Sequence, residues 1–189
     1  MNGSKDYDGL NKPPEHGSWY AGLTSDLQFS VDSPTINLGS LYELNNWTAT
    51  GTSILSATTG YANGYNVKAY ASNDGRLRLD ETANYISRWP YANSTPAIWD
   101  IDCPNNSSYC GFGYTTSDND LSGSGSADRF ASSTKYAGFA TTSPGDILAD
   151  STGPVQGATT AVTLKVSTDS TSTAGVYNTT IFFLCTPNY

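Results

Sequence analysis

The chain has 189 residues, of which 37% are hydrophobic and 14% are charged, and its formal net charge is −8. This length fits a single domain with a core of its own. The negative charge and the lack of a Lys/Arg cluster exclude electrostatic attraction to a phosphate backbone, so no nucleic-acid partner is expected. No window approaches the roughly 18 apolar residues of a spanning helix, so we expect no membrane insertion by this segment.

The composition predicts an all-β fold and an extracellular or cell-surface location. Thirteen Tyr, four Trp and many Thr favour strands over helices. Weak charge with abundant hydroxyl side chains is unusual for a cytosolic enzyme. The N-terminal sequence MNGSKDYDGL lacks the apolar core of a signal peptide, so a removed signal or an anchor elsewhere stays open.

The first 22 residues, 1–22, contain Pro13-Pro14 and several Gly without periodicity, which predicts a tail or linker. Residues 23–189 are then expected to form one domain. Alternation in LQFSV points Leu27, Phe29 and Val31 inward, and a second short strand is expected around Ile36 and Leu38.

A longer extended run follows in NWTATGTSILSATT, and GYNVKAYAS alternates Tyr65, Val67 and Ala69 against polar neighbours. Between these two runs, Asn63-Gly64 suits a hairpin. Asn73 to Gly75 predicts a tight turn, and RLRLD after it predicts a half-buried strand with Leu77 and Leu79 inward.

The stretch 118–135 is rich in Ser, Gly and Asp and predicts a long surface loop. Beyond it, AVTLKVSTD alternates with Val162, Leu164 and Val166 inward. The run AGVYNTTIFFLC is apolar on both sides, which predicts a strand covered on both faces. About eight to ten short strands indicate a two-sheet antiparallel β-sandwich, Ig-like or jelly-roll-like, with a barrel as the alternative.

Two of the three cysteines, Cys103 and Cys110, enclose the turn-forming residues PNNSSY. A hairpin loop closed by a disulfide is the favoured interpretation, and free thiols are the alternative. Zinc is disfavoured because the single histidine, His16, lies in the tail, and redox motifs use the tighter C-x-x-C spacing. Cys185 alternates with Ile181 and Phe183, so burial is favoured over pairing with another chain.

Catalysis has weak support. A Ser/His/Asp or Cys/His site needs a histidine fixed in the fold, which His16 does not provide. A glycosidase needs two carboxylates in a cleft, and Asp100 and Asp102 share one face of a predicted strand. The three glutamates do not lie in aromatic-flanked strands of alternating pattern: Glu15, Glu43 and Glu81. We therefore expect a non-enzyme without a cofactor and keep glycoside hydrolysis as an alternative.

Binding has two candidate sites. Trp89, Tyr91 and Trp99 could stack on sugar rings as in a carbohydrate-binding module, although large aromatics more often pack internally. Asp118 and Asp120, around Asn119, resemble part of a calcium loop, but the full calcium-loop pattern is absent and a plain surface loop is favoured.

Two covalent modifications are open. Asn-x-Ser/Thr sequences occur by chance in a Ser/Thr-rich chain, and they matter only in a host that glycosylates them; they include Asn46, Asn93, Asn106 and Asn178. A Lys–Asn crosslink would use Lys68 or Lys165 and needs a buried acid.

The stretches LQFSVDSPTINLGSL, TGTSILSATTGYANGYNVKAYASNDGRL, CGFGYTT and AVTLKVSTDSTSTAGVYNTTIFFLCTPNY resemble uncharacterised bacterial cell-surface β-sandwich domains of the kind predicted in Patescibacteria. STAGVYNTTIFFLCTP is similar to the closing strands of WxL-type wall-associated domains. Phe182-Phe183-Leu184 stands where that family has its Trp-x-Leu motif, so wall binding does not transfer. The resemblance implies secretion and surface display and supplies no catalytic residues.

Together these observations predict a non-enzymatic, exported structural or adhesive module of a larger envelope protein or appendage. Other surface proteins or glycans are the expected partners. The oligomeric state stays open, as does the ligand.

Overall fold

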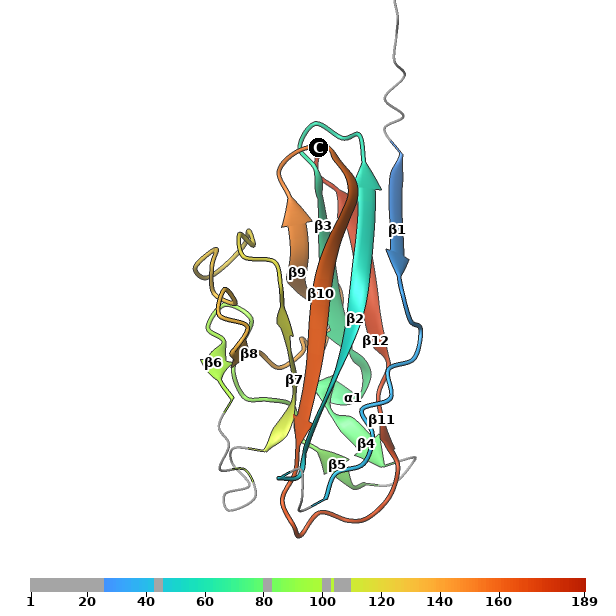
Figure 1. Ribbon diagram of the computed structural model, residues 1–189, viewed down its shortest axis with the longest axis vertical. Helices are drawn as coiled ribbons and strands as arrows, with labels where there is room; N and C mark the ends of the chain where they lie inside the picture. The colour runs from blue at the N-terminus through green and yellow to red at the C-terminus, as the bar shows by residue number, and fades with distance from the viewer. Residues whose placement is uncertain (1–25, 43–45, 80–82, 100–102, 104–109) are drawn as a thin grey trace, which may run out of the picture.

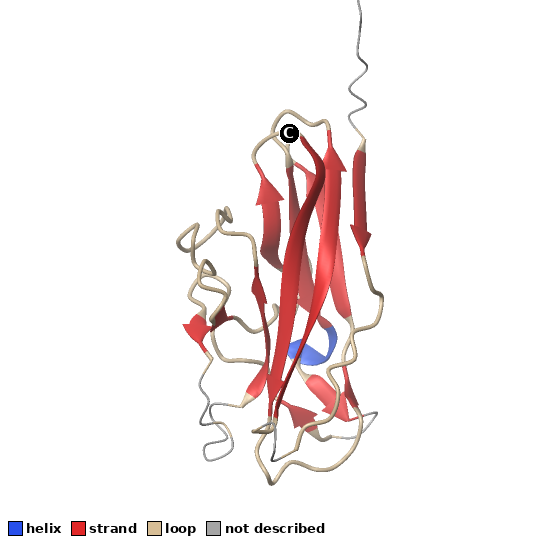
Figure 2. Cartoon of the chain, in the orientation of Figure 1, coloured by secondary structure: helices blue, strands red, loops and turns tan. Residues whose placement is uncertain are grey.

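The computed structural model describes residues 26–42, 46–79, 83–99, 103 and 110–189, and the predicted tail, 1–22, lies outside this part of the chain. The described residues are almost entirely strands and loops, as Figure 2 shows. No helix among them is long and apolar enough to cross a membrane. The predicted all-β class is confirmed.

Seven longer strands form two antiparallel sheets that face each other (Figure 1). The first sheet has the order β1-β2-β10-β7 and the second has the order β12-β3-β9. In the first sheet the strands are β1 (Leu27–Val31), β2 (Thr48–Thr59), β10 (Val155–Ser167) and β7 (Gly111–Thr116). In the second they are β12 (Ile181–Pro187), β3 (Tyr65–Ala71) and β9 (Asp146–Ser151). The predicted two-sheet antiparallel sandwich is therefore confirmed.

Five shorter strands build two small sheets at the margins. The first contains β11 (Tyr177–Asn178), β4 (Leu77–Leu79) and β5 (Tyr85–Ile86), and the second contains β6 (Ala97–Ile98) and β8 (Lys135–Tyr136). The short segment α1 (Ser72–Gly75) is a left-handed turn, because Asn73, Asp74 and Gly75 have φ values of 54°, 55° and 74°. This confirms the tight turn predicted for these residues.

The core lies between the two large sheets and follows the predicted alternation. Val162, Leu164 and Val166 of β10 are almost fully buried, as are Val67 and Ala69 of β3. The pairing of β2 with β10 runs from Thr48↔Ser167 to Thr59↔Val155 and is the longest strand pairing in the described part of the chain. Burial of these apolar side chains contributes roughly 1.5–3 kcal/mol for each large residue.

Three local predictions are wrong. Asn63-Gly64 forms a turn, but it connects β2 of one sheet to β3 of the other, so it is not a hairpin. Ile36 and Leu38 lie in a segment without strand structure, although both pack against the core. The strand β12 is not covered on both faces, because the side chains of Phe182 and Leu184 are 43% and 42% exposed.

Candidate functional site

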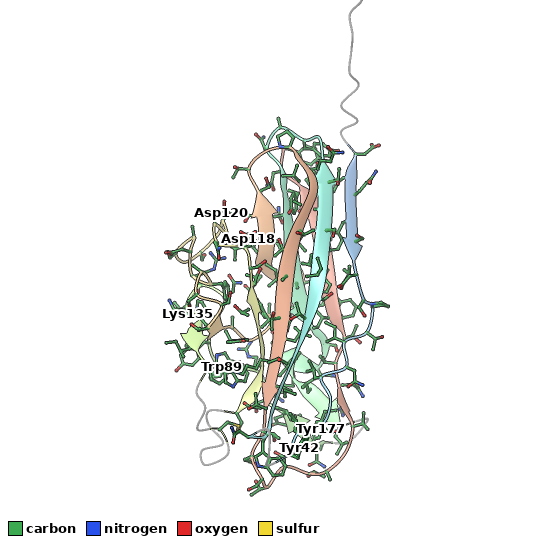
Figure 3. All side chains as sticks on the ribbon, in the orientation of Figure 1. Tyr42, Trp89, Asp118, Asp120, Lys135 and Tyr177 are labelled. Carbon is green, nitrogen blue, oxygen red and sulfur yellow. A yellow bond between two sulfur atoms is a disulfide. The ribbon has the colours of Figure 1, made fainter. Side chains whose placement is uncertain are left out.

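Of the three aromatic residues predicted to bind sugar, Trp89 is labelled in Figure 3, and the rings of Tyr91 and Trp99 both lie near its ring. The backbone N–H of Trp89 donates to the carbonyl of Phe112 at 2.7 Å, which fixes this segment to the edge of β7. Trp89 and Trp99 stack on each other, with ring centroids 4.1 Å apart and an interplanar angle of 12°. Tyr136 of β8 meets the Trp99 ring edge-on at 5.1 Å.

This packing contradicts the predicted sugar platform. Trp89 is 1% exposed and Trp99 is 5% exposed, so neither indole face is open to a ligand. Tyr91 remains 43% exposed, at 5.6 Å from the Trp89 ring. Stacking of large apolar rings is favourable inside a protein as well as against a sugar, and here each indole has the other as its stacking partner.

Lys165 completes this aromatic cluster from the outward side of β10. Its Nζ lies 5.2 Å from the centroid of Trp99 and 5.1 Å from that of Tyr136, which is cation–π distance. Burial lowers the pKa of the Lys165 ammonium group. The neutral form is less costly to bury than the cation, which explains this direction.

A sequence signal for the cluster exists in the glycines of β7. A Cβ on Gly113 would lie 2.6 Å from the carbonyl oxygen of Ala137 and 2.9 Å from the Cβ of Trp89. A Cβ on Gly111 would lie 3.1 Å from the backbone nitrogen of Trp89 and 3.2 Å from the carbonyl oxygen of Ser87. The motif GFG therefore lets two segments approach β7 closely.

The predicted disulfide between Cys103 and Cys110 is confirmed. Cys103 is 1% exposed, so one end of the bridge is anchored in the protein interior. The carboxylates proposed for a glycosidase lie outside the described residues, and so do the three glutamates: Asp100, Asp102, Glu15, Glu43 and Glu81.

The loop 118–135 is built around a buried arginine, which the sequence did not reveal. Arg129 is 4% exposed and uses all five guanidinium N–H groups. Nε and Nη2 donate to the Oδ1 of Asn93 at 3.1 and 2.9 Å. Nη1 and Nη2 also donate to loop carbonyls at 3.1 Å, those of Leu121, Ser126 and Ser122.

Asn93 links this loop to both sheets. Its Nδ2 donates to the hydroxyl of Tyr114 at 2.7 Å and to the carbonyl of Ile147 at 2.9 Å. Since Asn93 is 5% exposed and its amide is engaged, glycosylation of this side chain is incompatible with the fold. Asn46 and Asn178 are exposed, whereas Asn106 lies outside the described residues.

A polar pocket of ≈ 340 Å³ opens next to this arginine. Lys68 of β3 and Asp146 of β9 line it together with Asn93 and Arg129. Burial raises the pKa of the Asp146 carboxyl, while Arg129 and Arg88 oppose that rise. The Lys–Asn crosslink stays a prediction for Lys68, which shares this pocket with an asparagine and an acid.

The two aspartates of the calcium candidate lie near each other at the upper left of Figure 3. Asp118 accepts the backbone N–H of Asp150 at 2.9 Å through Oδ2, so it ties the loop to β9. Desolvation raises the pKa of Asp118 to about 6. Among the described residues no three His, Cys, Asp or Glu side chains are grouped to hold a metal ion.

Cys185 of β12 is a free thiol with intermediate exposure, so it is less deeply buried than predicted. Burial raises the pKa of this thiol to about 11. The thiolate that reacts with disulfides is therefore scarce at neutral pH.

Comparisons of the chain with protein-family models, with curated proteins and with solved structures found no match. The resemblance to bacterial surface domains stays a prediction.

Proposed function

We propose that the chain is a non-enzymatic structural or adhesive module of an exported cell-surface protein. One observation carries the proposal: in the part of the chain that the structure describes, the two stacked indoles and the buried guanidinium group are engaged inside the fold. Trp89 and Trp99 stack on each other, and every N–H of the Arg129 guanidinium group donates a hydrogen bond to Asn93 or to a loop carbonyl. Residues used in this way stabilise the domain and are not available to a substrate.

The disulfide supports export. Cys103 and Cys110 are bonded, and such bridges persist in non-reducing compartments. Outside a cell, a domain also meets proteases, which cleave exposed and locally unfolded segments. Leu121, Arg129 and Phe130 are buried, which anchors the loop 118–135 and should slow its local unfolding.

The shape supports a spacer or display role. The paired β2 and β10 extend along most of the long axis of the sandwich (Figure 1). A rigid sheet stack of this kind holds its two ends at a fixed separation and presents loops for contact with partners. The predicted partners, other surface proteins or glycans, would meet these loops.

Labelling of intact cells tests the proposal. An antibody against the folded domain is applied to cells of the source organism before and after permeabilisation, with an antibody to a cytosolic protein as the control. Signal on intact cells at a level unchanged by permeabilisation is the expected result. A signal that appears only together with the cytosolic control would overturn the proposal.

A further inference from the structure

The strand β12 has an open edge. It pairs only with β3 among the named strands, from Ile181↔Ala71 to Pro187↔Tyr65. The N–H of Ser72 donates to the carbonyl of Thr180 at 2.8 Å, and that of Asn188 donates to Gly64 at 3.0 Å. Hydrogen-bonded pairs alternate in an antiparallel ladder, so the even-numbered residues of β12 direct their backbone groups toward β3.

The odd-numbered residues of β12, Ile181, Phe183 and Cys185, therefore direct N–H and C=O groups away from β3. The described part of the chain offers them no backbone partner on that side. Unpaired strand edges are sites for adding another strand.

The facing sheet extends beyond this edge. In Figure 1, β1 forms the outermost strand and lies outside β12 in projection. The inner side chains of β1 are consequently only half-buried, unlike those of β10; they are Leu27, Phe29 and Val31. The second sheet has three strands where the first has four, so one strand position next to β12 and opposite β1 is unfilled.

The outer face of β12 is apolar as well. Phe182 and Leu184 are more than two-fifths exposed, and the Phe182 ring stacks on Tyr70 at 4.8 Å. No residue of β12 is charged, so the edge lacks the lysine or inward charge that usually prevents strand addition.

The outer edges of β7 and β9 are covered by other segments, whereas β1, on the same side of the sandwich as β12, pairs only with β2 among the named strands. Trp89 and Ala137 hydrogen-bond to the free edge of β7. Asp150 of β9 accepts the backbone N–H of Ser122 at 3.2 Å, and Asp118 accepts that of Asp150. The open position next to β12 is thus specific to one side of the sandwich.

Because β1 extends beyond the edge of β12, it restricts which segments can occupy the unfilled strand position next to β12. An antiparallel pairing of β12 with β12 of another copy would place two sandwiches about a twofold axis perpendicular to the sheet. The β1 strand of each copy would then collide with β2 of the other. A single extended segment meets no such obstacle.

We propose that residues 17–25 of a second copy of this chain add to β12 as an antiparallel strand. Their sequence, GSWYAGLTS, is uncharged like β12 and alternates Trp19, Ala21 and Leu23 on one side. These three side chains would pack beneath β1, and a register with Ala21 opposite Cys185 would place Leu23 opposite Phe183. The proposal names the partner of the structural module, a second copy of itself.

The direction of the strands favours a second copy over the chain's own segment. β1 begins at the end of the sandwich where β12 finishes, since Leu27 pairs with Thr59 and Pro187 pairs with Tyr65. The chain's own residues 17–25 would therefore have to run parallel to β12. Antiparallel pairing is slightly more stable and is open only to a segment from another molecule.

Cysteine crosslinking of the full chain tests the proposal with Cys185 as the reporter. Ala21→Cys and Leu23→Cys place a thiol on the side that faces the core, and Gly22→Cys places one on the opposite side as the matched control. After mild oxidation, we expect disulfide-linked dimers or longer ladders several-fold more abundant for Ala21→Cys or Leu23→Cys than for Gly22→Cys. Cys185→Ser in the same background should abolish them.

Two outcomes would overturn the proposal. A monomeric disulfide between residue 21 or 23 and Cys185 would show that the chain fills its own edge. Equal crosslinking of all three variants, or none, would show that the segment does not occupy this position. Cell-surface labelling is independent of either result, so failure of the strand exchange and failure of the proposed function are distinguishable.

Discussion

The guanidinium group of Arg129 holds the Oδ1 of Asn93 with two hydrogen bonds, from Nε at 3.1 Å and from Nη2 at 2.9 Å. Asn93 in turn donates to Tyr114 of β7 and to the carbonyl of Ile147 in β9. This pair therefore connects the loop 118–135 to both large sheets.

Replacement of Arg129 should be strongly destabilising. Arg129→Met leaves buried acceptors of the loop and Asn93 without donors, at a cost of about 1–3 kcal/mol for each unsatisfied group. We expect a loss of at least about 3 kcal/mol in the free energy of unfolding, measured by urea denaturation. Arg129→Lys should recover only part of it, because lysine has fewer donors. The exposed Arg78→Lys is the control, and equal stability of all these variants would contradict the role of Arg129.

The stacked indoles should be structural. Trp99→Ala removes a ring buried against Trp89 and Tyr136, and such truncations cost about 3–5 kcal/mol. The adjacent Ile98→Ala is the matched control, since Ile98 is 68% exposed and should change the unfolding free energy by less than about 0.5 kcal/mol. Comparable stability of both variants, with sugar binding lost only in Trp99→Ala, would restore the sugar-platform interpretation.

Ionisation of the Asp118 carboxyl should lower the free energy of unfolding as the pH rises. Its pKa is raised to about 6 by desolvation, above the value of 3.8 in an unfolded chain. Between these two values the native state binds more protons than the unfolded state, so the free energy of unfolding decreases with pH and then levels off. Because the carboxyl is partly exposed, we expect only about 1 kcal/mol.

Asp118→Asn keeps an oxygen for the N–H of Asp150 and cannot ionise. Denaturation curves between about pH 4 and pH 7 should therefore show a smaller decline for this variant than for the unmodified protein. Asp74→Asn, at an exposed residue of α1, serves as the control. Identical pH dependence of Asp118→Asn and the unmodified chain would refute the raised pKa.

The disulfide should contribute modestly to stability. Chain-entropy reasoning for so short a loop gives about 2–3 kcal/mol, which the double variant Cys103→Ser/Cys110→Ser should lose. Mass spectrometry after alkylation of the unfolded, unreduced protein should find a single modified cysteine, Cys185. Modification of all three before reduction would show that the bridge is absent in solution.

Two glycines with positive φ allow the cost of a steric clash plus backbone strain to be compared with the cost of backbone strain alone. Gly64 has a φ of +74°, and a Cβ there would lie 2.0 Å from the carbonyl oxygen of Ser151. Gly157 has a φ of +64° with nothing within 4 Å. Gly157→Ala should cost about 1–2 kcal/mol from left-handed strain alone. Gly64→Ala should cost clearly more in thermal or urea unfolding; an equal cost would mean that the Ser151 carbonyl shifts freely.

Local patterns predicted the faces of individual strands well. The alternation of Tyr65, Val67 and Ala69 places these three side chains in the core, and Asn73 to Gly75 turns as expected. Both features depend on neighbours along the chain, because side chains in a strand alternate and left-handed turns select Asn, Asp and Gly.

Features that depend on distant segments were not predictable in this way. Asn63-Gly64 is a good hairpin sequence, yet the strands on either side join different sheets because each must bury its own apolar face. The burial of Arg129 was hidden in a polar stretch, with Leu121 and Phe130 as its only apolar signals. Trp89 and Trp99 also fitted a binding platform, although internal packing was favoured, because aromatic rings stack on either kind of partner.

The central ladder joins residues 48–59 to residues 155–167, so the two strands at its centre are supplied by opposite halves of the chain. A nascent polypeptide cannot close this ladder until nearly all of it has been synthesised, and contacts between such distant segments form slowly. The delay leaves a long interval in which the chain is still unfolded. For the export proposed above, in which the chain would cross a membrane as an extended thread, that interval would be an advantage.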